Sequence, residues 1–282
     1  MSEGRDGDVV AALGAAFTAP GSDVALLDVH ADPDHHRAVF TLAGAPGTLA
    51  PALAAGAAAA IEHIDLNADR GLHPHVGALD VAPLVHLDTV CLGAACAEAL
   101  VAGELIGALG LPVFIYGALA GGRTRADLRR GGRAELARRV AAGELVADFG
   151  PRGGLHPSAG AVLVGARPPL VAFNVELAPP ATGADAARIA ALVRQGGTEG
   201  LAGLRAIGLE LAARGGVAQV SCNVEDHVAL PLARIVEAIG RHAEVAECEL
   251  VGLAPAAAFD GFPGDLAVRN RRTVEDALEV AG

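Results

Sequence analysis

The hydrophobic pattern is clearest in the second half of the chain, where strand-like and helix-like stretches alternate. Short apolar runs predict buried strands, and apolar residues spaced three and four apart predict amphipathic helices. Gly215 and Gly216 separate two of the strands and favour a hairpin. The predicted strands cover residues 170–177, 204–211, 217–224 and 247–253, and the predicted helices cover 184–194 and 232–239. The resulting order, βαββαβ, is that of a ferredoxin-like unit.

The first half follows the same order without its opening strand. Its pattern predicts helices at 9–17, 49–64 and 91–109, and strands at 24–29, 37–44, 79–87 and 112–117. We therefore expect an α/β (α+β) protein made of two related ferredoxin-like βαββαβ subdomains, each a sheet with helices packed on one face. The expected boundaries are 1–168 for the first subdomain, 169–256 for the second and 257–282 for a tail.

Composition narrows the classes of function. The chain has 282 residues, of which 52% are hydrophobic, so it can bury a large core. All 21 basic residues are arginines, and the lack of lysine excludes Schiff-base catalysis and a Walker A phosphate loop. A net charge of −12 and an aromatic content of 3% argue against a nucleic-acid surface. The expected partners are small molecules.

The cysteines and the apolar stretches indicate the compartment. Cys91, Cys96, Cys222 and Cys248 show no CxxC spacing, which favours a reducing cytoplasm over a zinc knuckle or a disulfide framework. The first residues are charged and contain no apolar signal core, and the longest apolar stretch, 49–61, is too short to span a bilayer. We expect a cytoplasmic protein that contacts no membrane.

Histidine is concentrated in two places. Five of the ten histidines, namely His30, His35, His36, His73 and His75, fall in two short stretches at the ends of predicted strands. Imidazole transfers protons near neutral pH, and loops at strand ends often carry functional groups. These stretches are therefore candidates for acid–base chemistry, and exposed loops without a chemical role are the alternative.

A metal site is a second interpretation of the same residues. His73 and His75 form an HxH pair, and His36 with Asp65 or Asp80 adds nitrogen and oxygen ligands that suit zinc. Pro74 stiffens the pair, which serves either metal geometry or the positioning of one catalytic imidazole.

Two further segments are distinctive. Residues 148–160 hold too many glycines and prolines for a strand or helix, so they form a shaped loop whose backbone N–H groups can approach a flat ring. An ordinary linker between the two halves is the alternative. Residues 121–139 hold seven arginines and only two acidic residues. We interpret them as a solvated helical face, with an anion site as the alternative.

Several of these residues lie in motifs that match a known family in order. The motifs are SEGRD at 2–6, LLDV at 26–29, the segment around Arg37, HPHVGALDV at 73–81, PVFIYG at 112–117, DFGP at 148–151, VGAR at 164–167 and LVAFNVEL at 170–177. Together they resemble glutamate formiminotransferase, also called glutamate formimidoyltransferase, in its stand-alone form without a cyclodeaminase part. The resemblance runs from Ser2 to about Leu253.

The resemblance implies a folate-dependent enzyme, usually a homodimer, that moves a formimino group from N-formiminoglutamate to N5 of tetrahydrofolate. Tetrahydrofolate is then a co-substrate, and no metal is required. The family's catalytic histidine falls on His73, and the residues assigned to the donor are Arg37, His30, His36 and His75. The family's folate-contacting loop falls on Gly150, Pro151, Arg152, Gly153, Gly154, Leu155, His156, Pro157, Ser158, Ala159 and Gly160.

Three positions depart from the family pattern. His75 replaces the arginine usual after HP, His30 replaces a second aspartate in LLDVD, and His36 replaces the asparagine before Arg37. The changes lie on the donor side, so the donor is either formiminoglutamate or a formyl analogue. Arg37 is retained, and a guanidinium suits a substrate carboxylate because it binds both oxygens at once.

Direct transfer to folate suits a chain without lysine, since it needs no enzyme nucleophile. His73 would accept the N5 proton and return it to the leaving nitrogen. Two other classes of protein use the same residues. A metal-dependent amidine or formamide hydrolase would use the histidines as ligands, and a non-catalytic folate-binding protein would keep the loop without the chemistry.

Overall fold

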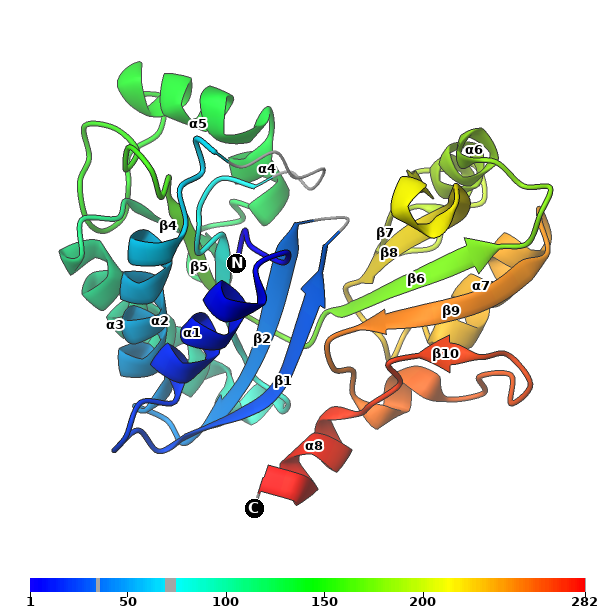
Figure 1. Cartoon of the computed structure of the whole chain (residues 1–282), viewed down its shortest axis with the longest axis horizontal. Helices are drawn as coiled ribbons and strands as arrows, with labels where there is room; N and C mark the ends of the chain where they lie inside the picture. The colour runs from blue at the N-terminus through cyan, green and yellow to red at the C-terminus, as the bar shows by residue number, and fades with distance from the viewer. Residues whose placement is uncertain (34–35, 69–74, 282) are drawn as a thin grey trace. The chain divides into compact units, whose positions relative to one another are not determined.

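The structure, a computed structural model, describes residues 1–33, 36–68 and 75–281 (Figure 1). The backbone divides into two units, Met1–Arg167 and Pro168–Gly282, which we describe separately. Both units combine helices with sheets, and this confirms the expected α+β class.

The second unit contains the βαββαβ order that its sequence predicts. Its elements are β6 (Val171–Leu177), α6 (Gly183–Val193), β7 (Leu204–Leu211), β8 (Val217–Val224), α7 (Leu232–Gly240) and β9 (Val245–Val251). The strands lie in the order β9-β6-β8-β7, and each of these neighbouring pairs is antiparallel. The first strand therefore lies between the third and the fourth, as in a ferredoxin-like sheet.

The two helices of this unit bury one face each against the sheet. Leu232, Ile235 and Ile239 of α7 are fully buried and share one helical face. α6 begins with a capping box, in which Thr182 and Asp185 each accept a hydrogen bond from the other's backbone N–H. The core lies between these helices and the sheet.

Residues 257–282 extend the second unit. They form the end of η3 (Ala256–Phe259), β10 (Val268–Arg269), which pairs in parallel with β9, and α8 (Val274–Ala281). Phe259 is buried, and the Phe262 ring lies 5.6 Å from it and 6.0 Å from that of Phe173. A two-residue strand is too short to show a period in the sequence, so the pattern could not reveal that this segment joins the sheet.

The first unit contains two sheets. Its elements are α1 (Gly7–Phe17), β1 (Val24–Asp32), β2 (Arg37–Gly44), α2 (Leu49–His63), β3 (Val81–Val85), η1 (Thr89–Cys91), α3 (Leu92–Ala108), β4 (Val113–Gly117), α4 (Arg125–Arg129), α5 (Gly132–Ala141) and β5 (Val162–Arg167). β1 and β2 form an antiparallel hairpin, whereas β3, β5 and β4 form a parallel sheet in that order.

Here the structure differs from the expected ferredoxin-like unit with helices on one face. Helices cover both faces of the parallel sheet, with α2 and α3 on one side and α4 and α5 on the other (Figure 1). Parallel strands need long crossover connections, and these connections place helices on both faces. The continuous burial of Val113 to Tyr116 in β4 is the sequence signal of such a strand.

The first residues of the chain join the two sheets of this unit. Met1 and Ala38 of β2 exchange both backbone hydrogen bonds, at 2.9 and 3.1 Å. Ser2 N then donates to Ala78 O at 2.9 Å, and the Ser2 hydroxyl donates to Gly77 O at 2.8 Å. The start of β2 is thereby held beside the residues that lead into β3.

A side chain from one helix caps another. Thr48, the residue before α2, makes no side-chain cap bond. Instead the carboxylate of Glu98, which is buried in α3, accepts hydrogen bonds from Ala50 N at 2.6 Å and from Gly47 N. Negative charge at a helix N-terminus is favourable, so Glu98 fixes α2 against α3.

We expect Glu98→Ala to lower the free energy of unfolding of the first unit by about 2 kcal/mol, because two backbone N–H groups lose their acceptor. Glu104→Ala is the matched control, since Glu104 lies on the exposed side of the same helix. It should change the stability by less than about 0.5 kcal/mol. Urea unfolding measures both, and equal stabilities for the two variants would contradict the capping role.

Candidate functional site

Asp80 organises the region that follows the predicted catalytic histidine. Its side chain is buried, and its Oδ1 accepts a hydrogen bond from Val76 N at 2.7 Å. Its Oδ2 forms an ion pair with the guanidinium of Arg129 in α4. One carboxylate thus ties the backbone at residue 76 to a helix that lies much later in the sequence.

Arg37, a predicted donor contact, lies in the same region. It is the first residue of β2 and lies opposite Asp32 in the hairpin. The amino group of Met1 is buried, which lowers its pKa to about 6, and the charges that act on it are those of Asp80, Arg37 and Arg129. These three charged groups therefore all lie in the region of the Met1 amino group.

His73 and His35 lie outside the described residues, and the assignment of His73 as the catalytic residue stays a prediction. His75 is described and is half-buried. Immediately after it, Val76 is fully buried, and its carbonyl accepts a hydrogen bond from Ala161 N at 3.0 Å. The backbone that follows the HPH segment is therefore anchored in the core.

The two remaining histidines assigned to the donor differ in their surroundings. His36 has a left-handed φ of 50°, and its Nδ1 lies 3.3 Å from the carboxylate of Glu3. The same Glu3 oxygen accepts hydrogen bonds from Gly4 N and Arg5 N, each at 2.7 Å. His30 is half-buried on β1, opposite Val39. Part of the SEGRD motif thus orients His36.

The glycine-rich segment 148–160 lies inside the first unit, because β5 follows it, so it is not a linker between the two units. At its start, Asp148 accepts a hydrogen bond from Ile115 N at 2.7 Å and pairs with Arg123. At its end, residues 156–160 form a tight turn. His156 N donates to Gly160 O at 2.8 Å, and Gly160 N donates to His156 O at 3.0 Å.

This turn contacts the chain on both sides of residues 69–74. Before them, Leu66 N donates to Ser158 O at 2.9 Å, and the Asn67 amide donates to Pro157 O at 3.2 Å. After them, Ala78 N donates to Ala159 O at 2.9 Å. The structure therefore brings the predicted folate loop to both flanks of the predicted catalytic segment.

Two arginines of the segment 121–139 make contacts in this region that its charge pattern does not predict. Arg129 pairs with Asp80, and Arg133 donates to the Asn67 side chain at 3.0 Å, so the segment 121–139 is not only a solvated face. Arg130 and Arg138 do lie on the exposed side and pair with neighbouring acids. The spacing of four between Arg125, Arg129 and Arg133 was the available signal.

Metal ligation receives no support from the described residues. Within residues 1–33, 36–68 and 75–281, no group of three or more His, Cys, Asp or Glu side chains is arranged to hold a metal ion. Asp80, a candidate ligand, uses its two oxygens for Val76 N and Arg129.

Comparison with known proteins identifies the family. The model of the formiminotransferase domain, N-terminal subdomain, matches residues 1–167. The chain belongs to the formiminotransferase family. It is 36% identical over 270 residues to the glutamate formimidoyltransferase of Streptococcus pyogenes serotype M1, with 92% of this chain and 88% of that protein aligned. The resemblance inferred from the sequence motifs is thereby confirmed.

Two other relatives of this formiminotransferase-family chain show how its length compares. A glutamate formimidoyltransferase of Thermoplasma acidophilum is 32% identical, with 92% of this chain and 87% of that protein aligned. The formimidoyltransferase-cyclodeaminase of Gallus gallus is 35% identical, and the aligned part covers 92% of this chain but 50% of that protein. The chain thus spans about half the length of its bifunctional relatives and most of the length of the single-function ones.

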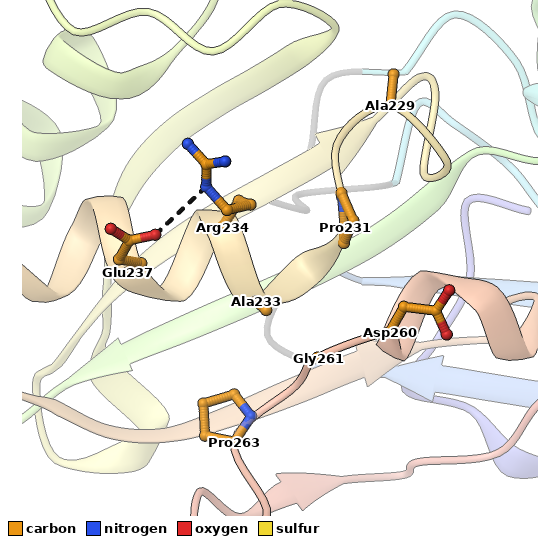
Figure 2. A pocket seen from close by; sticks show the side chains of 8 residues that line it. All are labelled: Ala229, Pro231, Ala233, Arg234, Glu237, Asp260, Gly261 and Pro263. Carbon is orange, nitrogen blue, oxygen red and sulfur yellow. Dashed lines mark ion pairs between the residues drawn. The ribbon is translucent and has the colours of Figure 1, made fainter.

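A shallow depression lies elsewhere, in the second unit of this formiminotransferase-family chain. Figure 2 shows the residues that line it, among them Arg234 and Glu237, which form an ion pair of 3.3 Å between largely exposed side chains. The lining residues are Ala229, Pro231, Ala233, Arg234, Glu237, Asp260, Gly261 and Pro263. None of the predicted site residues is among them.

The loop allows a direct test of which glycines are structural. Gly160 has a φ of +71°, and a Cβ there would lie 2.2 Å from Val76 O, so Gly160→Ala should lower the free energy of unfolding by about 3 kcal/mol. Gly153 is exposed and has no atom within 4 Å of an added Cβ, so Gly153→Ala should stay within about 0.5 kcal/mol of the wild type. Thermal and urea unfolding measure both. A Gly160→Ala variant as stable as Gly153→Ala would show that the turn does not hold the segment.

Proposed function

We propose that this protein is a glutamate formimidoyltransferase that transfers the formimino group of N-formiminoglutamate to N5 of tetrahydrofolate. The observation that carries the proposal is the alignment with single-function relatives of that name over nearly nine-tenths of their length. The hydrogen bonds that join the glycine-rich turn to both flanks of residues 69–74 support it, because the loop that we propose binds folate then contacts the chain on either side of the proposed acid–base segment.

The reaction needs one proton to move between two nitrogens. N5 attacks the formimino carbon and forms a new carbon–nitrogen bond, and the adduct is tetrahedral at that carbon. When the adduct collapses, the bond to the glutamate nitrogen breaks, and its electron pair stays on that nitrogen. His73 accepts the proton that N5 loses and donates it to the departing nitrogen, which leaves as the amine of glutamate. Such proton transfer contributes ~10²–10⁴ in rate.

The donor side of the proposal uses Arg37, His30, His36 and His75. Arg37 begins β2, and its charge acts on the buried Met1 amino group together with the charges of Asp80 and Arg129. His36 is oriented by Glu3. We assign no metal to the mechanism, since transfer of a proton and recognition of a carboxylate account for each step. We also propose a cytoplasmic location, with which the four free cysteines agree.

The mechanism predicts different effects for two neighbouring histidines. His73→Ala should lower kcat by ~10²–10⁴ with little change in folate affinity, because the proton carrier is lost while the folate loop is intact. His75→Ala is the matched control and should mainly raise KM for the donor. Steady-state transfer kinetics and a tetrahydrofolate titration measure both variants. A near-normal kcat for His73→Ala would overturn the mechanism, and activity that is lost on chelation and restored by zinc would favour a metal-dependent hydrolase.

We further propose that the protein is a homodimer that buries the outer face of α3. Large apolar side chains are exposed along this helix and on the segments that lead into it, namely Val85, Leu87, Val90, Leu92, Leu100, Val101, Leu105 and Leu109. Glu104 is the only charged residue exposed between residues 89 and 109. Two-fold symmetry brings the same patch of each copy together, so a helix with a single exposed charge buries few charges against its copy.

The other occupant for this face is a lipid surface, since Thr89–Ala108 is long and apolar enough to cross a membrane by length and composition. A helix of a protein core passes the same test, and about a third of this one is buried in the first unit. We favour a second copy of this chain, whose net charge is −12, because the same apolar face on that copy can cover this one without any other component.

Light scattering after size exclusion tests the dimer. The wild type should have twice the 28.1 kDa mass of one chain, and Val101→Glu should have the mass of one, because it places a charge in the apolar face. Val228→Glu is the control, since Val228 is 72% exposed in the second unit, and it should stay dimeric. A monomeric wild type would contradict the dimer, and flotation with lipid vesicles that Val101→Glu abolishes would assign the face to a membrane.

A further inference from the structure

A cluster of arginines lies at the carboxyl end of the parallel sheet. β4 and β5 are parallel neighbours, with Tyr116 opposite Gly165, and Arg167 ends β5 two residues later on the same face. The Tyr116 ring covers Gly165, where an added Cβ would lie 3.0 Å from the ring. α4 packs on this same face, because Leu128 shares a core with Phe114 and Leu163. Ligands of α/β proteins bind at this end of a parallel sheet.

Arg125 and Arg129 lie four residues apart in α4, so their side chains are on the same side of that helix. Burial lowers the pKa of the Arg129 and Arg167 guanidinium groups, and the positive charge of Arg125 lowers the pKa of both further. Tyr116 acts on both guanidinium groups in the opposite direction. Asp80 is the carboxylate that acts on Arg129. Three arginines and one aspartate therefore share a half-buried region.

This excess of positive charge contrasts with the rest of the chain, whose net charge is −12. Guanidinium groups gathered in one half-buried region attract oxyanions, which they bind through charge-assisted hydrogen bonds. The Tyr116 hydroxyl adds a polar atom to the region. It is buried, and it lies beside the Arg167 guanidinium. A hydroxyl donor beside guanidinium groups is suited to a carboxylate.

We propose that Arg125, Arg129, Arg167 and Tyr116 bind a carboxylate group of the substrate, with Asp80 holding Arg129 in place. The inference rests on the proposed function, in which the formimino donor carries two carboxylates and the glutamate part of the folate carries two more. Both are glutamate carboxylates, so the same site chemistry suits either. Guanidinium groups bind such oxygens in pairs, whereas a lysine would offer a single point charge.

Arg125 and Arg167 are the positions to change, because Arg129 also supports the fold through Asp80. Arg125→Ala and Arg167→Lys should each raise the KM of one substrate by ~10- to 100-fold, with kcat within about threefold of the wild type. A rise in the KM of formiminoglutamate assigns the site to the donor, and a rise in the KM of tetrahydrofolate assigns it to the folate tail. Arg130→Ala is the matched control, because Arg130 is exposed, pairs with Asp127 and its replacement makes the same change in charge as Arg125→Ala.

Direct binding separates this inference from the proposed function. L-glutamate and tetrahydrofolate are titrated separately into the wild type and the three variants by calorimetry, with circular dichroism to verify folding. If the wild type transfers the formimino group but Arg125→Ala and Arg167→Lys match Arg130→Ala in both KM values, the carboxylate site is wrong and the transferase stands. If the wild type shows no transfer, the proposed function fails, and the site stands only if these two variants bind one of the probes at least tenfold more weakly than Arg130→Ala.

Discussion

The buried carboxylate of Asp80 is the interaction on which the candidate site depends. It accepts a hydrogen bond from the backbone at Val76 and pairs with Arg129 of α4. A buried carboxylate that loses its partners is left with a large desolvation penalty. Asp80 therefore holds two distant parts of the chain together: the backbone at Val76 and the end of α4.

Periodicity predicted the second unit well because its helices and strands are amphipathic in the usual way. The stripe of Leu232, Ile235 and Ile239 and the hairpin at Gly215 and Gly216 are local signals that the tertiary structure does not override. The first unit was harder to predict. β5 carries the VGAR motif and is buried on both faces, so it shows no alternation, and its place between β3 and β4 comes from residues far away in sequence.

The residue types of the histidines and of the glycine-rich loop indicated one part of the candidate site. The high charge of residues 121–139 instead favoured a solvated face, so the part of the site that this segment supplies was not predicted. Histidines and a glycine-rich loop attracted attention by composition, and the loop indeed reaches both flanks of residues 69–74. Arg129 and Arg133 belong to a strongly charged segment, and such a charge pattern is typical of a solvated helical face. Their inward contacts depend on Asp80 and Asn67, which precede them by about fifty or more residues, so the local spacing of the arginines could not reveal these partners.

The order of the strands in the parallel sheet has a consequence for how the site assembles. β5 is the last strand of the unit in sequence but lies in the middle of the sheet, so β3 and β4 each pair with β5 and not with each other. During synthesis, β3 and β4 cannot form this sheet until residues 162–167 of β5 have been made. The turn at 156–160 immediately precedes this strand, so it reaches the flanks of residues 69–74 only in that same late step. Non-local closure of this kind is slow, and an incomplete unit would have exposed strand edges without a binding site.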